Sequence, residues 1–314
     1  MRCAGLLALA VVVGACRAQP ARQAPASVSA TALFGPVIGA EVIGGRADAG
    51  EEILLLAGGT DLVRLSLATR RFARDRLRIP PGEDCWNLAH TEDGALWTLK
   101  GRRTLARIES GAIVREVLLA EPHFGLFATG NRLLFQRADF TPPGPALLAG
   151  TADTPSRSPW STIVTKTYPS LARASVAALN MITCGPSDAS ERACWFPADA
   201  AVSMVFADGA TRHVALPGLD VVSPEILLTS DNPPRPIRDA YVDSAGEIWI
   251  LSSGTRPPGA GDVAGGWLLA RYGSDGALKG RVRLSAAARL LLRVNARSVI
   301  LLMSSGMIGQ VSRW

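Results

Sequence analysis

The sequence predicts an all-β protein, a six-bladed β-propeller with four-stranded antiparallel blades. Its apolar runs have the length of strands, and none keeps a helical period over three turns. A module made of a Gly turn, a Trp-centred strand, a Leu-Ala-Arg strand and a second Gly turn occurs at 94–113, and the same pattern returns at 246–278. Because one sheet module that recurs along a chain is typical of propellers, the repeat predicts a ring of such sheets.

Length and composition agree with one large domain. The chain has 314 residues, is 48% hydrophobic and 19% charged, and contains 31 glycines and 21 prolines, as expected of a well-packed chain that turns often. The net charge of +6 comes from scattered arginines. Since nucleic-acid binding usually needs a clustered basic face, we expect no nucleic-acid partner, and we expect a monomer.

The first 15 residues have the layout of a secretory signal. A basic start precedes an apolar run at 6–13, which is too short to span a bilayer. Residues 13–16, Val-Gly-Ala-Cys, resemble the bacterial lipobox, which implies cleavage before Cys16 and acylation of its thiol. The resemblance predicts a lipid-anchored protein of the bacterial cell envelope, on the outer membrane and in the periplasm if the cell is Gram-negative. The alternative is ordinary cleavage near Ala18 and a secreted protein.

Residues 16–34 are predicted to be a flexible tether, because Ala, Gln, Pro and Ser dominate them without an apolar period. Residues 35–314 are predicted to form the propeller. Within it, Cys184 and Cys194 flank a polar turn and could form a disulfide in an oxidising compartment, with two buried free thiols as the alternative. Cys85 has no evident partner and is expected to be a buried small apolar residue.

The predicted strands group into six modules. The first five cover 52–79, 86–119, 123–167, 175–216 and 237–284, and the sixth covers 285–314 with only three strands. Residues 37–44 form a further candidate strand. This N-terminal strand could complete the last blade and so close the ring by joining the two ends of the chain. Each blade would then use about 45 residues, an ordinary repeat length.

Residues 239–250, Asp-Ala-Tyr-Val-Asp-Ser-Ala-Gly-Glu-Ile-Trp-Ile, resemble the NHL-repeat and gluconolactonase-like six-bladed propellers. The resemblance implies a ligand site at one mouth of the channel, where the inner strands begin. It also implies, for the lactonase-like members, a site for Ca²⁺ or Mg²⁺ built from Glu, Asn and Asp. In this chain Asn87 and Asp239 stand at matching places, with Glu41 or Glu225 as the third ligand. The alternative role for such residues is to bond the neighbouring backbone at strand ends.

The inner-strand entries supply the candidate ligand-binding residues, which are Trp86, Asn87, His123, Arg238 and Asp239. Trp86 lies near a loop and could stack on a ligand. The three histidines are isolated and show no zinc-ligand spacing, and no Gly-x-Ser-x-Gly elbow is present. Trp97 and Trp249 hold matching repeat positions and are expected to pack between blades.

Two functions follow from these features. The favoured one is an envelope-anchored binding or scaffold propeller that recognises a protein, a glycan or a small ligand through one channel mouth, without catalysis and without a cofactor. The alternative is a lactonase or other hydrolase that depends on Ca²⁺ or Mg²⁺. A fold alone does not decide between them.

Overall fold

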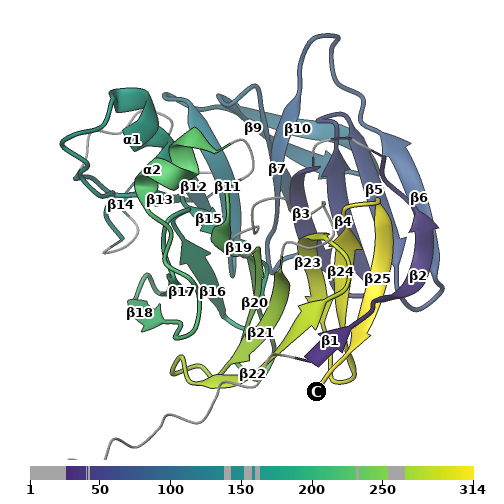
Figure 1. Ribbon diagram of the computed structural model, residues 1–314. Coiled ribbons are helices and arrows are strands. Elements are labelled where there is room, and N and C mark those ends of the chain that lie inside the picture. The colour runs from purple at the N-terminus through teal and green to yellow at the C-terminus, as the bar shows by residue number, and fades with distance from the viewer. Residues whose placement is uncertain are drawn as a thin grey trace, which may run out of the picture.

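The computed structural model describes residues 26–39, 41, 43–137, 143–151, 158–159, 163–230, 233–253 and 266–314. Six antiparallel sheets stand around a central channel, each running outward from it (Figure 1). The all-β class and the six four-stranded blades predicted from the sequence are therefore confirmed. The signal segment 1–15, the lipidation residue Cys16 and the first part of the tether lie outside the described residues.

The blades follow one another along the chain, and each begins with its innermost strand. The first contains β3 (Ile43–Ala49), β4 (Glu52–Ala57), β5 (Asp61–Ser66) and β6 (Arg71–Arg76). The second contains β7 (Cys85–His90), β8 (Leu96–Lys100), β9 (Thr104–Glu109) and β10 (Ala112–Leu118). The third contains β11 (His123–Thr129), β12 (Arg132–Arg137), β13 (Leu147–Gly150) and β14 (Ser158–Pro159).

The other three blades repeat the order. The fourth contains β15 (Thr183–Cys184), β16 (Glu191–Trp195), β17 (Ala201–Phe206) and β18 (Thr211–Ala215). The fifth contains β19 (Arg235–Val242), β20 (Ile248–Ser253), β21 (Trp267–Tyr272) and β22 (Leu278–Leu284). The sixth contains β23 (Ala288–Val294), β24 (Ser298–Met303) and β25 (Met307–Ser312), and its outermost strand is β2 (Thr31–Pro36).

An N-terminal strand closes the ring, as predicted, but the residues differ. The closing strand is β2, which pairs antiparallel with β25, so the prediction of residues 37–44 was wrong. Residues 43–49 form instead β3, the innermost strand of the first blade. A short strand β1 (Ala26–Val28) also adds parallel to β22, so the N-terminal segment pairs with both the fifth and the sixth blade (Figure 1). Strand structure therefore begins at residue 26, inside the segment 16–34 that was expected to be a tether.

The core consists of six clusters of buried apolar side chains, and each lies between two neighbouring blades. Trp97 packs between the second and third blades with Leu126 and Phe135, and it is 3% exposed. Trp249 is fully buried between the fifth and sixth blades with Leu291 and others. Both tryptophans are thus packing residues between blades, as the repeat predicted.

The fourth blade differs most from the prediction. The module at 175–216 was expected to begin with a strand, but its first five residues belong to helix α1 (Arg173–Leu179), and the inner strand β15 has only two residues. The Ala-rich sequence of α1 has strong helix propensity, which explains the difference.

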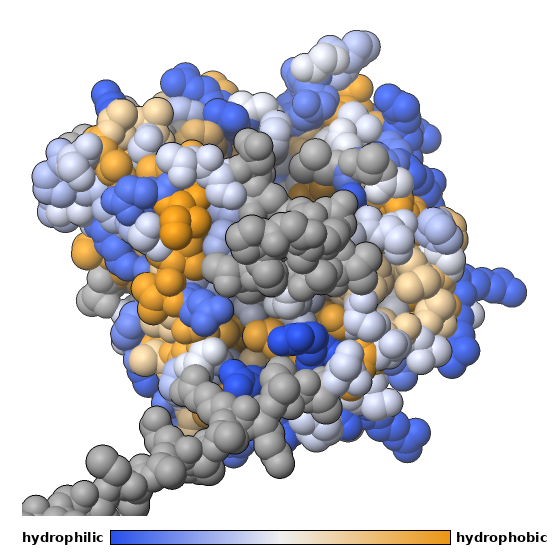
Figure 2. Space-filling model, viewed as in Figure 1, coloured by the Kyte–Doolittle hydropathy of each residue, from blue (hydrophilic) through white to orange (hydrophobic). Residues whose placement is uncertain are grey.

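A second short helix, α2 (Pro224–Thr229), follows the fourth blade and is drawn on the same side of the view as α1 (Figure 1). Apolar side chains gather on this side of the surface (Figure 2), and Val221 and Ile226 are 82% and 46% exposed. Neither helix, nor any other in the described part of the chain, is long and apolar enough to cross a membrane.

The predicted disulfide is present. Cys184 of β15 and Cys194 of β16 face each other in register, with their Cα atoms 4.0 Å apart. The bond fixes the short inner strand of the fourth blade to the strand beside it. Cys85 is buried as expected, and burial raises the pKa of its thiol to about 11.

Candidate functional site

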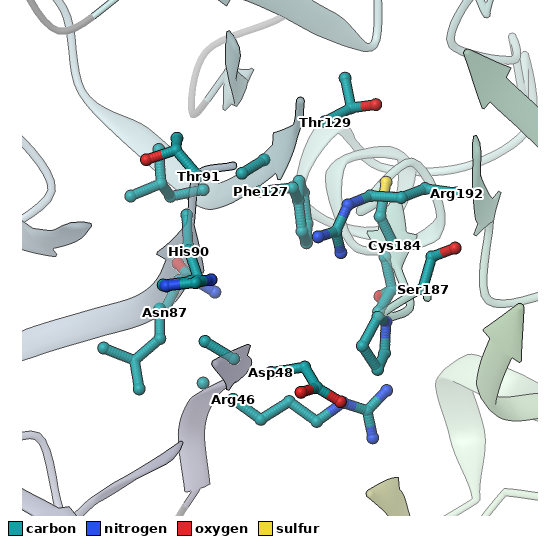
Figure 3. Close-up of a pocket in the computed structure, with 18 of the residues that line it drawn as sticks. Arg46, Asp48, Asn87, His90, Thr91, Phe127, Thr129, Cys184, Ser187 and Arg192 are labelled. Carbon is teal, nitrogen blue, oxygen red and sulfur yellow. The ribbon is translucent and has the colours of Figure 1, made fainter. Parts of the chain in front are cut away.

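The central channel contains a cavity of about 540 Å³, a size typical of small-molecule sites. All six blades contribute to its wall. The lining comes from most of β3, the C-terminal parts of β7 and β11, β15 with the loop to β16, Arg238 and Asp239 of β19, and Leu290 of β23. Figure 3 shows Arg46 and Asp48 entering it from β3, Asn87 and His90 from β7, and Arg192 from β16. The short β15 leaves room here, since the loop 185–190 replaces the rest of an inner strand.

The first of two ion pairs across the ring joins Arg46 to Asp239. The Arg46 guanidinium donates through Nη1 to Oδ2 of Asp239 and through Nη2 to Oδ1 at 2.5 Å. Oδ2 also accepts the backbone N–H of Leu291 at 2.6 Å, and Arg46 donates to the carbonyl oxygen of Leu291. The pair connects the first, fifth and sixth blades. The Asp239 side chain is 3% exposed, and both of its oxygens are used.

The second ion pair joins Asp48 of β3 to Arg293 of β23 through both carboxylate oxygens, with Nε of Arg293 2.9 Å from Oδ2. The hydroxyl of the fully buried Tyr241 lies 3.3 Å from Oδ2 of Asp48 and donates to Oδ1 of Asp188 at 2.6 Å. The carboxyl group of Asp188 turns inward to this hydroxyl, and burial there raises its pKa. These contacts fasten the inner side of the ring where its last and first blades meet.

Arg192, like Arg238, is a positive group of the cavity wall without an ion-pair partner among the described residues. Its Nη1 donates to the carbonyl oxygen of Gly185 at 2.8 Å, and no carboxylate of the described chain lies within ion-pair distance. Burial first, and the nearby Arg46 guanidinium second, lower the pKa of Arg192 to about 10. The group therefore stays charged at neutral pH. Figure 3 shows the guanidinium projecting into the cavity, on the side opposite Asn87 and His90.

Asn87 and Arg238 also bring unused hydrogen-bonding atoms to the cavity. Asn87 has a left-handed φ of 63° at an irregular point in the pairing of β7 with β8, and its buried Oδ1 has no partner. The buried Nε of Arg238 has none either. The Arg238 guanidinium lies over the Trp267 ring, 5.0 Å from its centroid, and burial and the neighbouring Arg235 lower its pKa. Strained backbone and unsatisfied polar atoms are features that cluster at functional sites.

The structure brings together three of the five predicted ligand-binding residues, since Asn87, Arg238 and Asp239 line the cavity. Trp86 and His123 lie outside it. Trp86 is 40% exposed and stacks on the guanidinium of Arg102, and His123 is fully buried against Phe135. The prediction missed Arg46 and Arg192. Arg46 could have been found by recognising residues 43–49 as an inner strand, whereas no local signal marks Arg192.

The residues proposed for a divalent metal do not fit one. Both oxygens of Asp239 are held by Arg46 and the backbone of Leu291. Glu225 lies exposed on α2 and Glu41 pairs with Arg74, and neither lines the cavity with Asn87. In the described part of the chain no three His, Cys, Asp or Glu side chains are grouped as metal ligands. A cation here would have to displace Arg46 from Asp239.

No protein-family model and no curated protein sequence matches the chain. Solved structures match its fold at low identity. A member of the DUF4221 family from Bacteroides vulgatus has a TM-score of 0.58 at 9% identity over 90% of this chain and 94% of that one. The calcium-binding protein regucalcin from Agrobacterium tumefaciens has a TM-score of 0.53 at 10% identity, over 91% of this chain and 95% of that one. The structure of U3-55K has a TM-score of 0.54 at 9% identity, over 92% of this chain and 100% of that one. This likeness shows the propeller fold alone.

Proposed function

We propose that this protein is a binding propeller of the bacterial cell envelope that takes a small ligand into the cavity of its central channel. The cavity of about 540 Å³ carries this proposal, because Asn87 and Arg238, each with a buried polar atom that lacks a partner, line it together with the guanidinium of Arg192. Ligand sites are mostly preformed hollows of this size with a few convergent polar groups. Binding without catalysis fits a wall whose Asp48 and Asp239 carboxylates are held in ion pairs.

The lipid anchor at Cys16 remains part of the proposal. Strand β1 begins at Ala26, so residues 17–25 would connect the lipidated residue to the propeller. Nine residues span at most about 30 Å when fully extended, which would keep the fifth and sixth blades close to the membrane surface. A Cys16→Ser protein should move from the membrane fraction to the soluble fraction. If it remained with the membranes at full anchored mass, the anchor would be excluded.

A metal-dependent hydrolase is the weaker candidate. One similar structure is named as calcium-binding, but that name belongs to a protein that shares 10% of its residues with this chain. The ion pair between Arg46 and Asp239 occupies the carboxylate that such a site would need. Adding Ca²⁺ or Mg²⁺ is therefore expected to leave the melting temperature unchanged, and a metal-dependent rise that Asp239→Ala abolishes would favour the hydrolase.

Thermal shifts with a panel of sugars, amino acids, organic acids and nucleotides test the binding proposal. A ligand at about 100 times its Kd adds about 2.7 kcal/mol to the free energy of unfolding, which raises Tm by about 5–10 °C in a domain of this size. Thr183 lines the cavity and is exposed to it, so Thr183→Trp should fill the space and abolish the shift. Thr31→Trp, on the outermost strand β2, is the matched control. No shift with any compound, or equal shifts in the Thr183→Trp protein, would contradict binding in the channel.

A further inference from the structure

The guanidinium groups of Arg46 and Arg192 face the channel cavity close to each other, but only that of Arg46 is held in an ion pair. Arg46 has the carboxylate of Asp239, whereas Arg192 donates one hydrogen bond of 2.8 Å to the carbonyl oxygen of Gly185. Like charges that share a poorly solvated space repel, and burial of a cation without an anion is unfavourable. Within the described residues, Arg192 therefore has no anionic partner of its own.

The protein holds Arg192 in place in spite of this cost. The disulfide between Cys184 and Cys194 ties β15 to β16 two residues from Arg192. Gly185, whose carbonyl accepts from Arg192, packs so close to β19 that a Cβ atom there would lie 2.0 Å from the carbonyl oxygen of Ala240. The segment that orients the Arg192 guanidinium is therefore cross-linked to β16 by the disulfide and packed tightly against β19 at Gly185. Such rigid support is expected of a binding group, because a preorganised side chain loses little entropy when its ligand arrives.

We propose that the ligand of the cavity is a small organic anion, and that its carboxylate or phosphate group binds the guanidinium of Arg192. The inference rests on the proposed function of the channel and names the class of ligand. An arginine fork matches either oxyanion through two parallel hydrogen bonds. An anion at this place would also relieve the repulsion between Arg192 and Arg46.

Asn87 adds a second requirement. Asn87 lines the cavity on the wall opposite Arg192 (Figure 3), and its buried Oδ1 accepts no hydrogen bond from the protein. A rotation of the side-chain amide would bring this acceptor to a hydroxyl group of the ligand. A hydroxylated acid of the size of a sugar acid therefore suits the cavity better than a bare inorganic ion.

The first experiment measures stability without any ligand. Arg192→Met removes the unpaired charge and keeps most of the apolar stem, so Tm should stay the same or rise. Replacing a binding residue commonly stabilises a protein while its function is lost. Arg212→Met is the matched control, because Arg212 lies on the same blade, is 45% exposed at its side chain and does not line the cavity. A fall in Tm of the Arg192→Met protein well beyond that of the control would mean that the arginine is structural and would overturn the proposal.

The second experiment compares glucuronate and glucose 6-phosphate with glucose, and includes inorganic phosphate alone. The three sugar compounds share a ring and differ in the anionic group. Comparing glucuronate with glucose 6-phosphate therefore separates a preference for a carboxylate from a preference for a phosphate. The wild-type protein and Arg212→Met should bind at least one organic anion more tightly than glucose. Arg192→Met should bind that anion about tenfold to a hundredfold more weakly, the range of a hydrogen bond to a charged group.

The outcomes separate this inference from the function on which it rests. In one outcome, glucose or another neutral compound binds as tightly as the anions, and Thr183→Trp abolishes binding while Arg192→Met does not. The channel would then be a binding site, but the proposal of an anionic ligand would be refuted. If none of the compounds binds, or if binding survives Thr183→Trp, the site itself is refuted. If inorganic phosphate alone binds as well as the organic anions, the role given to Asn87 is wrong.

Discussion

The ion pair between Arg46 and Asp239 offers a direct test of how the ring is held together on its inner side. Asp239→Asn keeps the shape of the side chain but removes its charge and one acceptor oxygen. The Arg46 guanidinium, whose side chain is 10% exposed, would then keep neutral acceptors alone, which are the amide oxygen of the new side chain and the carbonyl oxygens of Leu291 and Ala240. Removing one partner of a buried pair costs about 3–5 kcal/mol, because the other charge is left in a poorly solvated place.

That loss is large enough to measure by calorimetry or by urea unfolding. At about 2–4 °C per kcal/mol for a domain of this size, Tm should fall by about 10 °C. Asp75→Asn is the matched control, because the pair of Arg64 with Asp75 joins two adjacent outer strands with side chains 39% and 36% exposed. The control should lose less than about 1 kcal/mol.

The double variant Arg46→Met with Asp239→Leu completes the design. Because it removes both charges together, it should recover most of the stability that Asp239→Asn loses. A loss for Asp239→Asn no larger than that of Asp75→Asn would refute the reasoning, since Asp239 would then not be needed to neutralise Arg46 in the folded ring.

Four further predictions concern the cysteines and Asn87. Replacing Cys184 and Cys194 by Ser opens a loop with a sequence separation of 10 and should lower the free energy of unfolding by about 3 kcal/mol in urea titrations, whereas a loss below about 1 kcal/mol would contradict the chain-entropy estimate. The raised thiol pKa of Cys85 means that the native state binds the thiol proton more tightly than the unfolded state does. The free energy of unfolding should therefore decline as pH rises from about 9 to about 11, and should decline less in Cys85→Ala; identical pH profiles for the two proteins would exclude this. Native Cys85 should also resist iodoacetamide at pH 8 until urea unfolds the protein. Asn87→Gly should be more stable than Asn87→Ala by about 1 kcal/mol, because the left-handed φ strains alanine, and the reverse order would refute that.

Local patterns were sufficient for most of the fold. Trp97 and Trp249 follow Gly94 and Gly246, whose φ angles of 84° and 74° fit the tight turns that the repeat predicted. Apolar runs of strand length between such turns indicated the blades, and the polar turn between Cys184 and Cys194 indicated their disulfide. Each of these features depends on neighbours in sequence, which is why the chain by itself reveals them.

The first inner strand shows where local patterns fail. Residues 43–49, Ile-Gly-Gly-Arg-Ala-Asp-Ala, have little strand propensity, and they form β3 because β4 pairs with them. Gly45 is needed for contact with the next blade, since a Cβ atom would lie 2.3 Å from the backbone nitrogen of Leu88. The same holds for the closing strand β2, which is defined by its partner at the other end of the chain.

The sequence by itself determined the all-β class, the blade repeat, the disulfide and three residues of the cavity wall, Asn87, Arg238 and Asp239. Only the tertiary structure decided what these residues do. Ring closure brings Arg46 to Asp239, 193 positions away, and this turns a candidate metal ligand into half of an ion pair. The same closure leaves Arg192 without an acidic partner among the described residues. Strands follow from periodicity over a few residues, whereas the partner of a buried charge depends on which distant segments the closed ring places beside it.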